Sequence, residues 1–329
     1  MGEFDLIERY FKRHTHKAAL GIGDDCALLN PSRGMQLAVS SDMLVEGRHF
    51  LSTVDPARLG HKALAVNLSD LAAIGAEPLA FTLALSLPRV EEAWLAGFSS
   101  GLLRLADAHG CELVGGDTTQ GPLNICITVF GEVPPGDALL RQNAQVGDDI
   151  YISGTVGDAR LALEVFRGTQ TLSGPAFEQA RLRMELPTPR VALGTALRAV
   201  ANAAIDVSDG LLGDLGHILK RSGVGAQIDT GWLQTAGSFG ETHAPAGITP
   251  LLAELPWNKR LEFALAGGDD YELCFTAPVN QRELVHAAAW ETDTPVTRIG
   301  RITQEQGLVV LDPQGQPIAR RFASFDHFA

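Results

Sequence analysis

The 329-residue sequence contains little cysteine and few aromatic residues. Its four cysteines, Cys26, Cys111, Cys126 and Cys274, form no C-x-x-C pair, which argues against a zinc site or a disulfide framework. Cys126 and Cys274 lie within apolar runs, so we expect them to be small buried hydrophobic residues.

Positive charge is also scarce. The sequence has 26 Lys and Arg against 39 Asp and Glu, giving a formal net charge of −13, and it has no Lys/Arg-rich run. This balance argues against partners such as nucleic acid or anionic membranes. No uncharged apolar stretch is long enough to span a bilayer, and residues 1–16 do not resemble a signal peptide. We therefore expect a cytoplasmic protein.

Several motifs of well-known enzymes are missing. The sequence has no G-x-x-x-x-G-K-[ST] phosphate loop and no H-R-D or D-F-G set of a protein kinase. Its content of 45% hydrophobic and 20% charged residues is nevertheless typical of a folded globular protein. If this acidic chain handles phosphates, a bound metal and backbone N–H groups have to supply the positive charge.

The sequence instead has six short segments that carry aspartate, four of them with glycine as well, and most lie at the ends of apolar runs. Hard cations such as Mg²⁺ prefer oxygen ligands and usually also bind substrate phosphates. Glycine lets backbone N–H groups approach a phosphate closely. The segments, which together predict phosphate chemistry, are 21–25 (GIGDD), 40–42 (SSD), 67–70 (NLSD), 115–119 (GGDTT), 206–210 (DVSDG) and 267–272 (GGDDYE).

Hydrophobic periodicity predicts a mixed α/β domain in the first part of the chain. Asp55 and Pro56 are typical of a helix start, so a helix is expected from there to about Ala76. Further helices are expected at 6–11 and at 90–105, before Gly110. Strands are expected at 36–40, delivering Asp42 at the strand end, and at 81–87, 111–114 and 123–129.

The proline-rich segment 134–137 is the best linker candidate, so we expect one domain at 1–135 and a second at 136–329. In the second domain we expect helices at 189–200 and at 211–220, the latter stopped by Gly223. Strands are expected at 149–153, 271–276, 297–302 and 308–311, and a surface loop at 231–248.

Each segment has an ordinary structural explanation as well as a functional one. Segment 206–210 could simply cap the following helix, or could form an anion or metal site at the end of an apolar run. Segment 115–119 could be a turn, or a ligand-binding loop at the carboxyl end of a strand. Asp70 and Asn67 share one face of a helix. This face could be exposed to solvent, or it could bind a ligand.

The remaining candidates carry similar alternatives. Asp24 and Asp25 could form a turn. Alternatively, they are a pair of like charges whose repulsion a bound cation would relieve. Segments 40–42 and 267–270 could be an ordinary strand end and loop, and 148–149 is expected to be a turn. His49 and Arg141 could be ordinary exposed residues, although an arginine can bind a phosphate through two hydrogen bonds.

Taken in order, five longer segments resemble the thiamine-monophosphate kinase family of the aminoimidazole-ribonucleotide-synthetase-like superfamily. They are 21–29 (GIGDDCALL), 67–76 (NLSDLAAIGA), 115–119 (GGDTT), 206–211 (DVSDGL) and 267–273 (GGDDYEL), and the resemblance covers nearly the whole chain. It implies a two-domain α/β architecture whose N-terminal sheet forms a homodimer interface. It also implies transfer of a phosphoryl group from ATP to thiamine monophosphate, with Mg²⁺ as cofactor, and leaves a role for K⁺ open.

The resemblance also implies roles for individual residues. Metal binding is implied for Asp25, Ser40, Ser41, Asp42, Asp70, Asp117, Asp206 and Asp209. ATP contacts are implied for Gly116, Asp117, Arg141 and Ser208, and substrate contacts for His49, Asp269 and Phe322. The family usually has glutamate at the position of Asp269 and often tryptophan at that of Phe322, and both replacements keep the chemical type.

No side-chain nucleophile stands out, so we expect direct in-line transfer in which Asp42 and Asp117 act through metal. Two alternatives are an amidine-forming synthetase of the same superfamily and a non-catalytic nucleotide-binding relative.

Overall fold

The computed structural model describes residues 2–234, 247–320 and 322 of the chain. It divides into two compact units. The first unit comprises Met1–Leu71 and Ala76–Gly136, and the second comprises Ala72–Gly75 and Asp137–Ala329. Each contains its own β-sheet and helices, so the expected mixed α/β class is confirmed.

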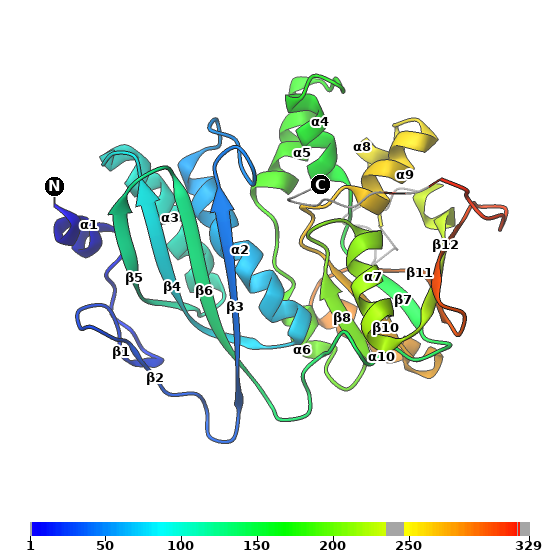
Figure 1. Ribbon diagram of the computed structural model, residues 1–329, viewed down its shortest axis with the longest axis horizontal. Helices are drawn as coiled ribbons and strands as arrows, with labels where there is room; N and C mark the ends of the chain where they lie inside the picture. The colour runs from blue at the N-terminus through cyan, green and yellow to red at the C-terminus, as the bar shows by residue number, and fades with distance from the viewer. Residues whose placement is uncertain (1, 235–246, 321, 323–329) are drawn as a thin grey trace. The chain divides into compact units, whose positions relative to one another are not determined.

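The first unit is built on a four-stranded sheet with the strand order β3-β6-β4-β5 (Figure 1). The strands are β3 (Gln36–Val45), β6 (Asn124–Val133), β4 (Glu77–Leu87) and β5 (Glu112–Gln120). β6 pairs antiparallel with β3 and β4, whereas β4 and β5 are parallel. Helices α2 (Pro56–Ile74) and α3 (Glu92–Ala108) cover one face of the sheet.

Short elements complete this unit. Helix α1 (Glu3–Tyr10) forms where the apolar spacing predicted it, and β1 (Ala18–Leu20) pairs with β2 (Leu28–Leu29). The predicted start of α2 is also confirmed: the Asp55 carboxylate accepts hydrogen bonds from the N–H groups of Ala57 and Arg58. These bonds satisfy amide groups that have no partner within the helix.

All four strand predictions for this unit were too short, and two of them misplaced site residues. β3 continues to Val45, so Asp42 lies inside the strand rather than at its end. β5 continues to Gln120, so Gly115, Gly116 and Asp117 are strand residues and not a loop. In both cases the neighbouring strand supplies a continuous hydrogen-bonding partner, and this pairing outweighs the weak strand preference of Ser, Asp and Gly.

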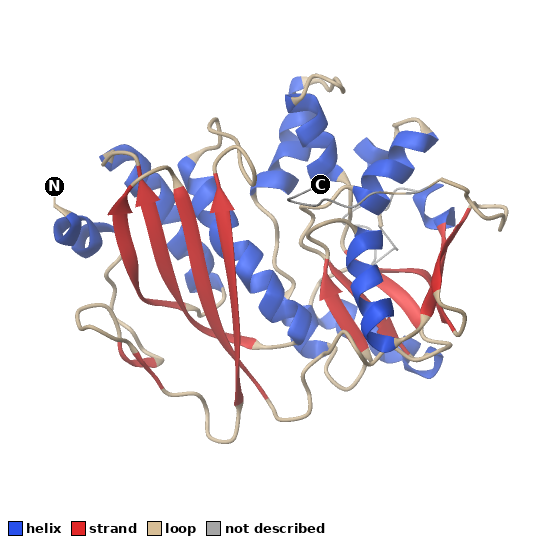
Figure 2. Cartoon of the chain, in the orientation of Figure 1, coloured by secondary structure: helices blue, strands red, loops and turns tan. Residues whose placement is uncertain are grey.

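The second unit has a six-stranded sheet with the order β12-β9-β11-β7-β10-β8. β9 and β12 are parallel and the other pairs are antiparallel. Figure 2 shows its strands and helices by colour. The strands are β7 (Asp149–Ser153), β8 (Ala203–Asp206), β9 (Gly225–Asp229), β10 (Leu273–Ala277), β11 (Val296–Thr303) and β12 (Gly307–Leu311).

The larger α-helices of the second unit are α4 (Asp158–Phe166), α5 (Gly174–Glu185), α7 (Leu211–Ser222), α9 (Trp257–Ala266) and α10 (Arg282–Glu291), and α8 (Pro250–Ala253) is a single turn. α7 ends as predicted, with Gly223 in the left-handed conformation. The helix expected at 189–200 is shorter, because α6 covers only Val191–Ala196 and Ala199 has a positive φ of 59°.

The surface loop expected at 231–248 is only partly a loop. Its first residues belong to a 3₁₀ turn, η1 (Thr230–Gln234), and Ile248 is buried in the core of the second unit. Residues 235–246 lie outside the described part of the chain. None of the helices in the described ranges combines the length and apolar character that crossing a membrane requires.

Candidate functional site

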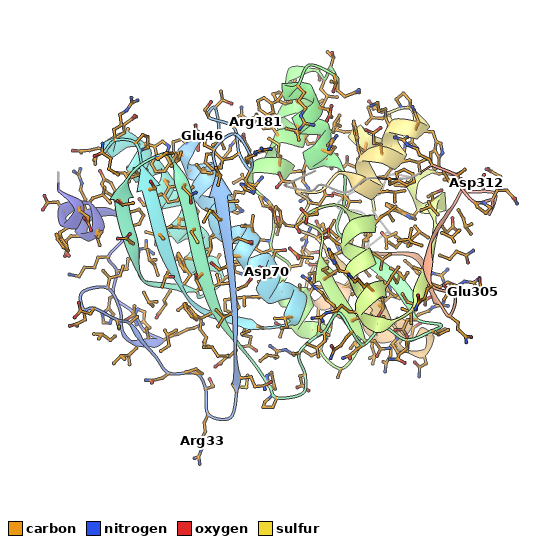
Figure 3. All side chains as sticks on the ribbon, in the orientation of Figure 1. Arg33, Glu46, Asp70, Arg181, Glu305 and Asp312 are labelled. Carbon is orange, nitrogen blue, oxygen red and sulfur yellow. The ribbon has the colours of Figure 1, made fainter. Side chains whose placement is uncertain are left out.

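In the first unit, hydrogen bonds join the polar residues of β3 to those of α2. Ser40 Oγ donates to Asp70 Oδ2 at 2.5 Å, and the Asp42 N–H donates to Asn67 Oδ1 at 3.1 Å. Asn67 is buried and also donates to the Ala63 carbonyl, whereas Asp42 and Asp70 are half-buried. Figure 3 labels Asp70 on α2. The Asn67–Asp70 face is therefore packed against β3 and is not a freely solvated face.

The alternation of β3 separates Ser41 from its two neighbours. Ser40 and Asp42 lie on the face that α2 covers, so the intervening Ser41 side chain points to the opposite face. Its hydroxyl lies 3.0 Å from Thr128 Oγ1 and 3.1 Å from the Ile127 carbonyl of β6. The structure thus brings Ser40, Asp42 and Asp70 together, but it does not bring the Ser41 hydroxyl to them.

Asp117 is also separated from this group within one chain. Across the sheet, Asp42 is paired with Ile127, which is paired with Leu83, which is paired with Gly116. Three strand spacings amount to about 14 Å. Asp117 belongs to the next row, with Met43, Cys126 and Ala84. The side chains of that row lie on the face opposite to the helices, which we call the outer face, so Asp117 does not approach Asp42 in its own chain.

Gly116 has a structural reason to be glycine. Its φ is +145°, and a Cβ atom built on it would lie 1.8 Å from the Leu83 carbonyl oxygen. The close approach of β4 and β5 therefore excludes a side chain there.

Three other predicted residues are positioned as follows. Asp25 is exposed in the segment before β2. His49 lies in the turn after β3, where its Nδ1 accepts a hydrogen bond of 2.9 Å from the Val45 N–H. Cys126, expected to be buried, is only half-buried because it faces the outer side of the sheet.

In the second unit, segments 206–210 and 267–272 lie side by side. Asp206, at the end of β8 as predicted, is paired with Leu273 of β10. The Asp269 N–H donates to the Ser208 carbonyl at 2.7 Å, and the Tyr271 N–H donates to the Val207 carbonyl at 2.9 Å. The structure therefore brings Asp269 to the same loop pair as the predicted metal and ATP ligands Asp206, Ser208 and Asp209.

The loop that leads into α7 is held by a residue that the sequence analysis did not single out. Asp214 Oδ2 accepts hydrogen bonds from the N–H groups of Ser208, Asp209 and Gly210, at 3.0–3.1 Å. Neither Ser208 nor Asp209 is the capping residue, since the helix is preceded by Gly210. These three amides are thus bound to a carboxylate of their own helix and are not open to a phosphate. Burial, reinforced by the charge of Asp209, raises the pKa of Asp214 to about 7.

Buried carboxylates hold the 267–272 segment in a strained shape. Asp269 and Tyr271 both have positive φ, 63° and 52°, which is unfavourable for residues other than glycine. Between and after them, Asp270 and Glu272 are buried. Asp270 accepts a hydrogen bond from the Gly157 N–H at 2.9 Å, and Ser153 Oγ donates to Glu272 at 2.6 Å.

Two arginines complete the anchoring of Glu272. Arg190 makes two hydrogen bonds of 2.7 Å to its carboxylate, and Arg183 makes one of 2.8 Å. Although burial raises the pKa of Glu272, the two guanidinium groups outweigh it and hold that pKa below its ordinary value. No pattern in the sequence pointed to these arginines, because their partner is about 80 to 90 residues away.

The last two predicted residues also lie in the second unit. Phe322 is half-buried against the hydrophobic core, and the guanidinium of Arg320 lies 5.4 Å from the centre of its ring. The ring therefore already accepts a cation over its face. Arg141 is exposed, and its carbonyl accepts a hydrogen bond from Ser222 Oγ.

Within the described ranges, no three Asp, Glu, His or Cys side chains lie close enough together to hold a metal ion by themselves. Mg²⁺ is commonly held by one or two carboxylates, with water and substrate phosphates completing its coordination. Asp42 and Asp70 in the first unit, and Asp206 and Asp209 in the second, are the candidate carboxylates for such coordination.

Comparison with known proteins places the chain in a family. Residues 23–133 match the N-terminal domain of AIR synthase related proteins, and residues 145–312 match the C-terminal domain. The chain is 44% identical to thiamine-monophosphate kinase of Escherichia coli K12 over 333 aligned residues, covering 100% of this chain and 98% of the relative. It is 42% identical to the enzyme of Haemophilus influenzae, with the same coverage.

Solved structures agree with the sequence matches. Thiamine-monophosphate kinase of Stenotrophomonas maltophilia superposes with a TM-score of 0.81 at 47% identity, over 92% of each chain. AaThiL complexed with AMPPCP and TMP superposes with a TM-score of 0.73 at 28% identity, over 91% of this chain and 89% of that one. The chain therefore belongs to the thiamine-monophosphate kinase family of AIR synthase related proteins.

Proposed function

We propose that the protein phosphorylates thiamine monophosphate with ATP, giving thiamine diphosphate and ADP. The observation that carries this proposal is the 44% identity to thiamine-monophosphate kinase over the full chain. It is supported by the pairing of Ser40, Asp42 and Asp70 on β3 and α2, and by the joining of Asp269 to the Asp206–Asp209 loop.

The donor atoms of these groups suit Mg²⁺. Asp42, Asp70, Asp206 and Asp209 offer carboxylate oxygens, and Ser40 adds a hydroxyl oxygen, so all are hard ligands. We propose these residues and Asp25 as the ones that hold Mg²⁺, which would neutralise charge on the phosphates. A contribution of Ser41 would use its backbone carbonyl, because its hydroxyl faces away. Comparing assays in KCl and NaCl tests whether K⁺ assists.

The protein's own residues then position the substrates. We propose that Ser208, Gly116 and Arg141 contact ATP, and that His49, Asp269 and Phe322 contact thiamine monophosphate. The ring of Phe322 suits a flat cationic ring, since it already pairs with the Arg320 guanidinium. The acceptor phosphate itself is the nucleophile, so transfer is in line and forms no phosphoenzyme. Inversion at an isotopically chiral γ-phosphorus would agree with this, and net retention would contradict it.

We further propose a homodimer that packs through the outer face of the first unit's sheet. β3 exposes Leu37, Val39 and Met43 on this face, with 44–56% of each residue accessible. Such an apolar strip on a folded protein is typical of an interaction surface. Asp117 lies on the same face, so a second copy would bring Asp117 of one chain toward the β3 strand of the other.

A direct assay tests the function. The purified protein is incubated with ATP, Mg²⁺ and thiamine monophosphate, and thiamine diphosphate is measured by chromatography. We expect product that depends on all three components. Absence of thiamine diphosphate, together with binding of ATP, would favour the non-catalytic alternative.

We also propose a cytoplasmic location. The four free thiols and the use of ATP fit a reducing cytoplasmic location.

A further inference from the structure

A second polar cavity lies in the second unit, lined by residues to which no role has been assigned above. It has a volume of about 500 Å³ and lies among β7, β9, β11, η1 and the start of α10. Three arginines line it: Arg282, Arg298 and Arg301. The volume falls within the range of small-molecule sites, roughly 300–1,000 Å³.

The three arginines carry more positive charge than the carboxylates of the cavity neutralise. Asp149 is buried and receives two hydrogen bonds from Arg282, at 2.6 and 3.0 Å. Arg298 adds a single longer one of 3.3 Å, and among the described residues Arg301 bonds to the neutral Gln227. The other lining carboxylate, Asp229, accepts from the Gly231 N–H. Three positive charges against two negative ones leave an excess of one positive charge in a chain whose net charge is −13.

A β-bulge brings two of these arginines to one face of the sheet. Along a regular strand, residues three apart point to opposite faces. The pairing of β11 with β7 shifts between Arg298 and Gly300, so Arg298 is paired with Tyr151 and Arg301 with Asp149. Tyr151 and Asp149 lie on the same face of β7, and therefore so do Arg298 and Arg301. Bulges that redirect side chains in this way are frequent near binding sites.

Next to the bulge, the close pairing of β11 with β9 requires glycine at position 300. A Cβ atom at this position would lie 2.2 Å from the Gln227 carbonyl oxygen of the adjacent strand β9. Concentrating like charges on one face is unfavourable unless an anion balances them. Arg298 retains 55% of its side-chain exposure and Arg282 retains 41%, so their guanidinium groups remain accessible to a ligand.

We propose that this cavity binds an organic phosphate monoester, with Arg298 and Arg301 holding the phosphate. Guanidinium groups bind phosphate oxygens through paired, charge-assisted hydrogen bonds. The cavity is much larger than one phosphate ion, so room remains for the organic part beside Trp232 and Leu311. The site is distinct from the loops that carry Asp206 and Asp269, and its occupation does not depend on the proposed kinase reaction.

The test is calorimetric titration of the full chain with two probes, inorganic phosphate and ribose 5-phosphate. We expect ribose 5-phosphate to bind more tightly than phosphate. The double variant Arg298→Gln/Arg301→Gln should weaken its binding by at least about tenfold. The matched control is Arg167→Gln, whose side chain is 52% exposed and pairs with Glu164 outside the cavity. It should bind like the wild type.

Any result other than the expected one would contradict the proposal. Equal binding of both probes would reduce the cavity to a site for the inorganic anion. Absence of binding, or unchanged binding in the double variant, would overturn the site altogether. If the double variant melts at a lower temperature, the single variant Arg301→Gln replaces it, because Asp149 then keeps both of its arginines.

Discussion

At the scale of single residues, the two half-buried carboxylates between β3 and α2 carry the sharpest prediction. Asp42→Asn removes a charge but keeps the shape of the side chain and the backbone bond to Asn67. We expect the rate of thiamine diphosphate formation to fall by at least about 100-fold, because charge neutralisation dominates phosphoryl transfer. The melting temperature should change little.

The matched control for Asp42 is Asp107→Asn, which breaks an exposed pair with Arg13. Exposed pairs contribute little to stability, so this variant should keep both activity and melting temperature. Unchanged turnover in Asp42→Asn would show that the metal assignment is wrong.

A second residue-scale prediction concerns Glu272, which lies buried between Arg183 and Arg190. Glu272→Gln removes the buried counter-charge of two half-buried guanidinium groups, so we expect a loss of about 3–5 kcal/mol of unfolding free energy. Urea denaturation measures this loss. Glu262→Gln, which breaks surface pairs with Lys259 and Arg320, should cost less than about 1 kcal/mol. Similar losses in both variants would contradict the anchoring role.

The same residue makes stability depend on pH. Because the pKa of Glu272 is lower in the folded state than in the unfolded state, its stabilising contribution is complete above the unfolded value, about 4.3. The contribution is lost as the pH falls through the folded pKa. The stability difference between wild type and Glu272→Gln should therefore shrink below about pH 4. Denaturation at a series of pH values checks this, and a constant difference down to pH 3 would refute it.

At the scale of secondary-structure elements, the close contact between β4 and β5 limits which residues can replace Gly116. A methyl group there meets the Leu83 carbonyl at 1.8 Å, so Gly116→Ala should cost more than about 2 kcal/mol of stability. Gly34→Ala is the matched control: its φ is also positive, +84°, but no atom lies within 4 Å of the added carbon. It should cost only about 1 kcal/mol. Equal unfolding midpoints for the two variants would contradict the close approach.

The elements also illustrate where sequence patterns succeed. The helix start at Asp55 and Pro56 and the helix stop at Gly223 were predictable, because capping depends on neighbouring residues alone. The extension of β5 through Gly115–Thr119 was not, because the partner that stabilises it is β4, which lies about 30 residues earlier in the chain. The ion pair of Asp149 with Arg282 was not predictable for the same reason, although β7 begins at Asp149 as the expected strand 149–153 does.

At the scale of the whole molecule, the separation of Asp42 and Asp117 within one chain makes the proposed dimer testable. The Asp42 side chain lies on the face that α2 covers, but β3 is the edge strand of the sheet, so a partner's Asp117 can reach it only around that edge. If each site takes Asp42 from one chain and Asp117 from the other in this way, Asp42→Asn and Asp117→Asn should complement each other. In a mixed dimer one of the two sites is then fully intact. After unfolding and refolding together in equal amounts, about a quarter of wild-type activity should return.

The control is each variant refolded alone, which should stay inactive. Light scattering verifies that the refolded protein is dimeric. Failure of the mixture to recover activity, with mixed dimers demonstrated by differently tagged chains, would refute the shared site.

The sequence by itself was enough to identify the family. The aspartate-bearing motifs that mark the family, and their order, can be read directly from the residues. The sequence also determined helix ends, which depend on local capping chemistry. Only the tertiary structure decided which side of a strand each residue faces, and so separated Ser41 from Ser40 and Asp42. It alone revealed that Asp214 holds the loop before α7, and it brought Arg183 and Arg190 to Glu272. Strand register and long-range ion pairs arise from contacts between distant segments, and a linear pattern does not specify them.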